Sequence, residues 1–233
     1  MTQSRNQLLN VLPQNIFAAL APHLRDVKLV FADIVAEPDE PVNRVYFPHT
    51  GVISLVIEME TGSMIETAMV GRDGAVNATS ALDGKTSFQK GIVQVAGAAS
   101  VVSSDTLRSI ADEFEPFRSV LIRHEQVLLA QAQQSAGCNA SHTVEARMCR
   151  WLLRIRDLTG SDEVELTQEF LSQMLGVRRT SVSLVAHTLQ AADFIRYRRG
   201  HIKIMDAEKL RSGACECYES VRARYETLVV PEV

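Results

Sequence analysis

The sequence predicts an α+β fold: an N-terminal antiparallel β-barrel, then a long helix, then a C-terminal domain of short helices with one hairpin. Three successive patterns along the 233 residues indicate this order. Short β-type segments occupy residues 27–103, a helical stretch follows from about residue 104, and several short helices begin near Ser141. We therefore expect two domains, residues 1–140 and residues 141–233, with the long helix at about 105–138.

The β-type segments alternate with turn residues. VKLVF, RVYF, GVISLVIEM, SMIETAMV and KGIVQVAG are separated by EPDEP, HTG, TGS and DG. Several short strands at regular spacing with turn signals between them are typical of an antiparallel barrel or sandwich. A short helix is expected just before them, at about 14–21.

The long helix carries an apolar stripe with steps of four and three residues, which is the spacing of one helix face. Such a face needs either the chain's own barrel or a second copy to cover it. Its two polar members resemble the positions that fix register between paired helices, so we expect a homodimer. The stripe consists of Phe117, Leu121, His124, Leu128 and Gln131, with Ser135 one step further.

Two short helices joined at a glycine follow in the C-terminal domain. Thr167 is a good N-cap for the first helix, and Gly176 allows a sharp turn into the second, at about 178–190. Val177 fills the angle between them. The segment after them, 195–204, alternates apolar and polar residues around Arg199–Gly200, as a tight hairpin does. Together these features predict a winged helix-turn-helix.

The outward residues of this unit suit a nucleic acid. From Leu166 to Lys203 there are six Lys/Arg against two acids, although the whole chain has a formal net charge of −4. Arginine can fork onto guanine edges and hydroxyls can reach phosphates, while Arg196 and Lys203 add positive charge to the wing. We predict contacts with double-stranded DNA by Thr167, Gln168, Arg178, Arg179, Thr180, Ser181, Ser183, His187, Arg198 and Arg199.

The remaining bulk features exclude other classes of protein. No apolar run is long enough to span a bilayer, and the N-terminus does not look like a secretory signal, so a cytoplasmic protein without a membrane partner is expected. The sequence contains no nucleophile elbow, P-loop, zinc-protease or dinucleotide motif, so we do not expect an enzyme.

With barrel, long helix and winged helix-turn-helix in this order, nearly the whole chain resembles the Crp/Fnr family of bacterial transcription regulators. The strongest stretches are RVYFPHTGVISLV, VGRDGAV, EARMCRWLLRIRD and LTQEFLSQMLGVRRTSVSLVAHTLQAADFIRYRRGHI. The tail ACECY is similar to that of a branch common in alphaproteobacteria. The resemblance implies a cyclic-nucleotide-binding-like jelly roll (a cupin-like sensor) and a homodimer paired through the long helix. It also implies a palindromic operator and RNA polymerase as a partner.

The recognition helix departs from cyclic-AMP-receptor-like members, which carry a glutamate and a second arginine after the first arginine. The matching positions hold Thr180 and Leu184, and only Arg179 and the buried Val182 remain. A different operator is therefore expected.

The effector site departs too. Where the resemblance implies a glutamate after Gly71, the sequence has Arg72 and then Asp73, and Gln89 and Lys90 stand where an Arg-Ser pair is expected. Lys85 or Lys90 could approach a phosphate, but without a bidentate fork. We predict an altered pocket of Gly71, Arg72, Asp73, Gln89 and Lys90 that does not bind cyclic AMP, and no required cofactor. The effector stays open.

The four cysteines do not form a CxxC pair, and none precedes Cys138, which argues against an N-terminal iron–sulfur cluster. On an unbroken helix, Cys138, His142, Glu145 and Cys149 would share one face and could ligate a metal or sense oxidation. A hinge and N-cap at Asn139 and Ser141 would break that face, so buried structural cysteines are predicted instead.

Cys215 and Cys217 are expected to point in different directions on a helix. We therefore assign no metal site from the sequence. Whether any of these side chains senses a metal or the redox state is left undecided by the sequence: Cys138, His142, Cys149, Cys215 or Cys217.

These patterns together predict a homodimeric, sequence-specific DNA-binding transcription regulator. The alternative is a ligand or redox sensor whose winged helix makes protein–protein contacts. The basic wing distinguishes the two, because a protein-binding wing does not need this positive charge.

Overall fold

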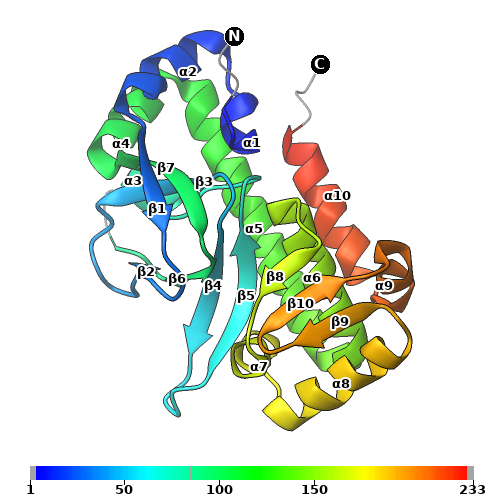
Figure 1. The fold of residues 1–233 in the computed structure, drawn as a ribbon. Helices are drawn as coiled ribbons and strands as arrows, with labels where there is room; N and C mark the ends of the chain where they lie inside the picture. The colour runs from blue at the N-terminus through cyan, green and yellow to red at the C-terminus, as the bar shows by residue number, and fades with distance from the viewer. Residues whose placement is uncertain (1–3, 84–85, 230–233) are drawn as a thin grey trace.

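The computed structural model describes residues 4–83 and 86–229, and Lys85 lies outside these ranges. The N-terminal strands form two antiparallel sheets (Figure 1). One has the order β1-β7-β3 and the other β2-β6-β4-β5. Their bounds are β1 Arg25–Leu29, β2 Ile34–Ala36, β3 Arg44–Pro48, β4 Val52–Glu58, β5 Met64–Val70, β6 Lys90–Val95 and β7 Gly97–Ser103.

The two sheets face each other across a common apolar core. Leu29 and Ala99 from the first sheet pack with Ile53, Val70 and Val93 from the second. Within the described residues, no ladder joins an edge strand of one sheet to the other sheet, so the predicted barrel is an open, jelly-roll-like sandwich.

Helices make up the rest of the N-terminal half. They are α1 Gln7–Asn10, α2 Gln14–Leu20 with the 3-10 turn η1 Ala21–His23, α3 Ala78–Asp83, α4 Ser104–Glu113 and α5 Glu115–Ser141. The single helix expected at 105–138 is thus two helices. Phe114 is extended, with φ −118° and ψ 92°, and Pro116 stands in the first turn of α5. The break occurs there because proline is tolerated in a first turn but disrupts a helix interior.

The apolar stripe of α5 is covered by the chain itself. Phe117 and Leu121 pack in the core beneath α2 and α4, and Leu128 joins the core between the sheets. His124 is fully buried and Gln131 is 2 % exposed. The stripe is therefore not the free face for a second copy that the sequence suggested, because the barrel and the C-terminal helix already occupy it.

The C-terminal half contains α6 Val144–Thr159, α7 Gln168–Leu175, α8 Arg179–Ala191, α9 Ala207–Gly213 and α10 Cys217–Val229. A sheet of order β8-β10-β9 completes it, with β8 Glu163–Glu165, β9 Ile195–Arg198 and β10 His201–Ile204. The hairpin was expected and β8 was not. The helix break lies at His142–Thr143, where the Thr143 side chain caps α6, and not at Asn139 and Ser141, which remain within α5.

The two halves share one core. Val52, Met69 and Ile92 of the β-sandwich pack in the same cluster as Trp151 and Leu175 of the C-terminal helices. In Figure 1, α10 runs beside α5, and α7 lies next to β5. Among the described residues, no helix is long and apolar enough to cross a membrane.

Candidate nucleic-acid interface and its supporting contacts

Helices α7 and α8 form the predicted helix-turn-helix. The Thr167 hydroxyl caps α7 by accepting a hydrogen bond from the Phe170 N–H at 3.1 Å. Gly176 ends α7 with φ +60°, a left-handed conformation that favours glycine. Val182 and Leu189 anchor α8 in the core. The predicted helix at 178–190 is thereby confirmed to within one residue at each end.

The outward face of α8 carries most of the predicted contact residues. Arg178, Arg179, Thr180 and His187 are exposed. Arg178 is the N-cap residue and makes no side-chain cap bond, so the first N–H groups of this 13-residue helix point outward without a side-chain acceptor from the cap. Such an end favours a phosphate oxygen.

Besides Thr167, two further predicted contact residues bond to each other within the protein. The Ser183 hydroxyl donates to Gln168 Oε1 at 2.7 Å, which ties α8 to the start of α7. Ser183 and Ser181 are half-buried. Ser183 and Gln168 therefore fix the angle between the helices, and this role could not be read from a sequence in which they stand 15 residues apart.

Leu184 is an exposed residue of α8 that was not among the predicted DNA contacts. Its side chain is 68 % exposed in the middle of α8, between Thr180 and His187 on the outer face. An exposed aliphatic side chain on a recognition helix can contact a thymine methyl group. The sequence pattern could have revealed this exposure, because Leu184 does not share the helix face of the buried residues Val182, Ala186 and Leu189.

The wing is a two-residue hairpin. Arg198 pairs with His201, and the turn residues Arg199 and Gly200 both have positive φ, at +50° and +82°. Two positive φ angles define the type I′ turn, whose twist matches that of the strands. The Tyr197 hydroxyl donates to the Leu166 carbonyl at 2.9 Å, which holds the wing against the start of the helix-turn-helix. Arg196, Arg198 and Arg199 are exposed.

The unexpected strand β8 changes the charge of the wing. Lys203 forms an ion pair with Glu163 across the sheet, at 2.8 Å, and His201 lies 3.7 Å from Glu165. Lys203, which was predicted to add positive charge to the wing, is thus partly offset by a neighbouring carboxylate. The unpaired positive charge of the wing lies on the β9 arginines and the turn residue Arg199.

The five predicted effector residues do not surround one pocket. Gly71 packs on α6, so closely that a Cβ there would lie 2.9 Å from Leu158. Asp73 is paired with Arg154, whereas Lys90 is paired with Glu58 at 2.6 Å and Gln89 is exposed. Arg72 and Asp73 do line a space of about 530 Å³ together with Arg154 and Tyr225, but Gln89 and Lys90 are not among its lining residues. The predicted grouping of all five residues therefore does not form.

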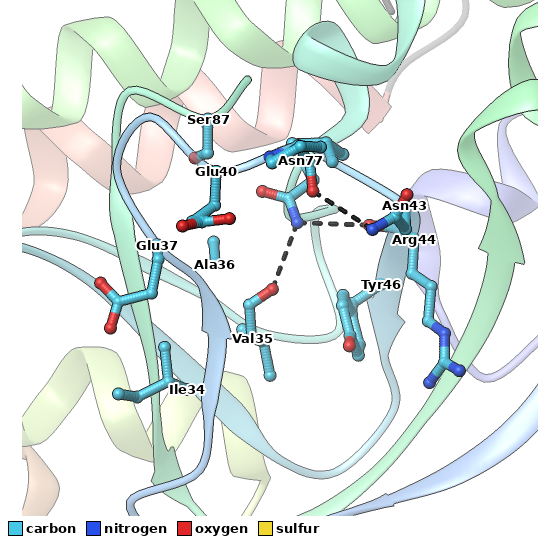
Figure 2. A pocket seen from close by; sticks show the side chains of 12 residues that line it. Ile34, Val35, Ala36, Glu37, Glu40, Asn43, Arg44, Tyr46, Asn77 and Ser87 are labelled. Carbon is cyan, nitrogen blue, oxygen red and sulfur yellow. Dashed lines mark hydrogen bonds between the residues drawn. The ribbon is translucent and has the colours of Figure 1, made fainter. Parts of the chain in front are cut away.

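A different pocket opens in the β-sandwich. This space of about 410 Å³ is lined by β2, β3, the segment between them, and residues Asn77 and Ser87. Figure 2 shows the side chains that line it. Asn77 closes one side by donating to the carbonyls of Val35 and Arg44, at 3.3 and 3.2 Å. Glu37 and Glu40 both line it, while the Arg44 guanidinium extends away from them (Figure 2).

A buried polar network joins the two halves at Asp73. Its carboxylate lies 2.7 Å from Arg154 on α6, and both side chains are 8 % exposed. The Arg154 guanidinium stacks over Tyr225 of α10, 4.3 Å from the ring centroid. The Tyr225 hydroxyl donates to Gln131 of α5 at 2.9 Å. The network thus links the sandwich, the long helix and both flanking helices of the C-terminal half.

His124 lies beside this network. Its Nε2 accepts a hydrogen bond from the Ala75 N–H at 3.2 Å. Burial lowers the pKa of His124 to about 4, although the Asp73 charge acts in the opposite direction. The imidazole is therefore neutral at pH 7 and positions the segment after β5, instead of pairing with a second copy.

A second buried contact between the halves is centred on Glu66 in β5. Trp151 Nε1 on α6 donates to its Oε1 at 3.0 Å, and Ser54 and Gln94 donate to its Oε2 at 2.6 and 3.2 Å. Burial raises the pKa of Glu66 to about 7, against the effect of these donors and of Arg150. Sequence patterning gave no sign of this site, because Glu66 interrupts an apolar segment and looks like an ordinary surface acid.

Comparison with known proteins agrees with this geometry. The Crp-like helix-turn-helix domain matches residues 146–212, a range that begins within α6 and ends within α9. No curated protein matches the chain by sequence.

Solved structures share the fold over most of the chain. FixK2 from Bradyrhizobium japonicum is 15 % identical, with a TM-score of 0.67, over 82 % of this chain and 98 % of that one. A CRP/FNR-family transcriptional regulator from Thermus thermophilus is 18 % identical, with a TM-score of 0.66, over 82 % and 98 %. The c-di-GMP-responsive regulator CLP from Xanthomonas campestris is 14 % identical, with a TM-score of 0.65, over 83 % and 100 %. The chain thus carries a Crp-like helix-turn-helix domain at residues 146–212, within the fold of the Crp/Fnr transcription regulators.

Proposed function

We propose that the protein is a homodimeric, sequence-specific DNA-binding transcription regulator of the cytoplasm and has no catalytic activity. The observation that carries this proposal is the Crp-like domain, in which Arg178 and Arg179 stand exposed at the start of α8 beside a basic hairpin. Helix α8 enters the major groove with its N-terminal residues on base edges, and the wing lies along the backbone. A protein-binding wing would not need these arginines.

The dimer forms through the outer face of α5, opposite the buried stripe. Ile122 and Leu129 are 45 % and 58 % exposed there. They belong to a run with alternating steps of four and three residues, which is the spacing of a helix-pair seam. Its small residues near the C-terminal end allow close approach of two helices. The exposed members of the run are Ile122, Gln126, Leu129, Gln133, Ala136 and Ala140.

A two-fold dimer presents two α8 helices, so the operator is palindromic. RNA polymerase is the protein partner that the family resemblance implies. Cyclic AMP is not the effector, and DNA binding requires no organic cofactor. Two carboxylates, Glu37 and Glu40, line the sandwich pocket, and these repel a cyclic phosphate where an arginine fork would be needed to hold it.

Replacing Arg179 by alanine is expected to relax base preference at one position in each half-site. A lost bidentate contact to a guanine costs about 1–3 kcal/mol of discrimination. The measurement is a fluorescence-anisotropy titration of wild type and variant against the preferred site, single-base variants of it, and random duplex. Equal weakening on specific and random duplex would contradict a base-reading role for Arg179.

Arg198→Ala is the matched control, because it removes an equal charge from the wing. This substitution is expected to weaken binding to all DNA sequences alike. It should also reduce the slope of the logarithm of the binding constant against the logarithm of salt concentration by about one unit. If the salt slope stayed unchanged, the wing would not lie in the interface.

A further inference from the structure

Four potential metal ligands from two distant parts of the chain meet at the base of α5. Cys138 and His142 come from its last turn and C-cap, and Cys215 and Cys217 precede and begin α10. One ligand atom from each residue can be chosen so that all four lie within 4.8 Å of one another. The sequence had offered Cys138 and His142 with Glu145 and Cys149 instead. The helix break at His142 removes those two partners, and the fold supplies the tail cysteines in their place.

The spacing within the cluster suits a tetrahedral ion. The Cys138 and Cys215 sulfurs are 3.5 Å apart, and the Cys217 sulfur lies 3.6 Å from His142 Nδ1. Bonds of about 2.3 Å to sulfur and about 2.0 Å to nitrogen place tetrahedral ligand atoms roughly 3.5–3.8 Å apart. Both short edges of the cluster match this range. The 4.8 Å limit on the other separations requires only a small side-chain adjustment.

The surroundings of the cluster support ligands rather than inert thiols. His142 Nε2, on the ring side away from Cys217, lies 3.1 Å from the Glu216 carboxylate. A carboxylate behind a histidine fixes the tautomer that leaves the other nitrogen free for a metal. The Gln134 amide donates to the Cys217 sulfur at 3.0 Å. Such a donor stabilises a thiolate.

The charge of the environment also favours a thiolate site. Arg147 and Arg150 of α6 are 6 % and 8 % exposed and lie close enough to act on Cys138. Three thiolates and one divalent ion would leave the site with a net negative charge, which would face these two buried guanidinium groups.

We propose that Cys138, His142, Cys215 and Cys217 bind one Zn²⁺ per chain and thereby fasten the C-terminal helix to the end of the long helix. Three thiolates and one imidazole form a closed structural zinc set with no open position. The site spans the break at His142–Thr143, where the chain passes from α5 into the DNA-binding domain. Zinc therefore holds that domain in its position on α5.

The test uses the full chain, purified under reducing conditions and stripped of metal with a chelator. Titration with Co²⁺ is expected to produce the visible bands of a tetrahedral ion and a thiolate charge-transfer band, saturating at one equivalent. Zn²⁺ should displace the Co²⁺ and raise the thermal unfolding temperature. Neither the Co²⁺ spectrum nor the unfolding temperature depends on DNA. A failure to bind metal can therefore be distinguished from a failure of the proposed DNA-binding function. Absence of the tetrahedral spectrum in reduced wild type would overturn the proposal.

Variants separate the ligands from other buried groups. Cys217→Ser and His142→Gln should lose the spectrum at one equivalent, and Glu216→Gln should weaken Co²⁺ binding by about 10- to 100-fold. Cys149→Ala is the matched control, a buried cysteine outside the cluster that should leave binding unchanged. Equal loss in Cys149→Ala and Cys217→Ser would overturn the assignment of ligands.

Oxidation of the cluster cysteines is the outcome that would contradict zinc binding. The short Cys138–Cys215 separation also permits a disulfide. If mass spectrometry found that disulfide and the reduced wild type failed to bind Co²⁺, the cluster would be a redox pair and the zinc site would be wrong. This reading needs only wild-type protein, so it holds even where a variant fails to fold.

Discussion

Replacing Asp73 by alanine is expected to lower the free energy of unfolding by about 3–5 kcal/mol. The substitution leaves the Arg154 guanidinium buried without its carboxylate, in a site that is 8 % exposed. An uncompensated buried charge is among the most destabilising changes a single substitution can produce. The cost should be visible in urea unfolding, as a lower midpoint with both halves of the molecule affected.

Two comparisons make this result specific. Arg156 and Asp162 form an exposed pair at 2.5 Å, with side chains 40 % and 52 % exposed, so Asp162→Ala should cost about 1 kcal/mol or less. Adding Arg154→Met to Asp73→Ala should recover much of the loss, because the orphan charge is removed. If Asp73→Ala cost no more than Asp162→Ala, the buried pair would not hold the two halves together.

Glu66→Gln is expected to abolish a pH-dependent loss of stability that wild type shows between about pH 4.5 and pH 7. The pKa of Glu66 is raised to about 7 by burial from an ordinary value of 4.5. Between these values the folded chain holds a proton that the unfolded chain has released. The contribution of Glu66 is therefore full below pH 4.5, falls as pH rises, and is lost above pH 7, by about 3 kcal/mol in all.

The measurement is the difference in unfolding free energy between wild type and Glu66→Gln across this range. The difference is needed because His124, whose pKa is lowered to about 4, contributes with the opposite sign. Wild type should lose stability relative to the variant as pH rises from 4.5 to 7. If the unfolding free energies of wild type and variant changed in parallel with pH, the Glu66 carboxyl would not carry a proton in the folded chain over this range.

The helix-turn-helix could be predicted because its signals are local. The Thr167 cap, the Gly176 turn and the Arg199–Gly200 hairpin each depend on the conformational preference of one or two residues. Their bounds therefore emerged from the sequence within one or two positions. Strand β8 was missed because three residues carry too little pattern, and its partner lies almost 40 residues away.

The contacts between the halves could not be predicted, because they depend on docking. His124 and Gln131 look like register positions for a helix pair, yet they are buried by Ala75 and Tyr225 of the same chain. A buried stripe predicts that a helix is covered and does not identify what covers it. The zinc cluster escaped detection for the same reason, since Cys138 and Cys215 are 77 residues apart.

Selection of bound duplex from a random pool tests the central claim most directly. Wild type should enrich a palindrome whose half-sites lie about 34–36 Å apart, one helical turn. Leu129→Glu, which places a charge in the seam of α5, should lose the palindrome, whereas Ile57→Glu at an equally exposed apolar position on β4 should keep it. Failure of wild type to enrich any sequence, or enrichment of a site without two-fold symmetry, would contradict a homodimeric regulator that reads DNA through α8.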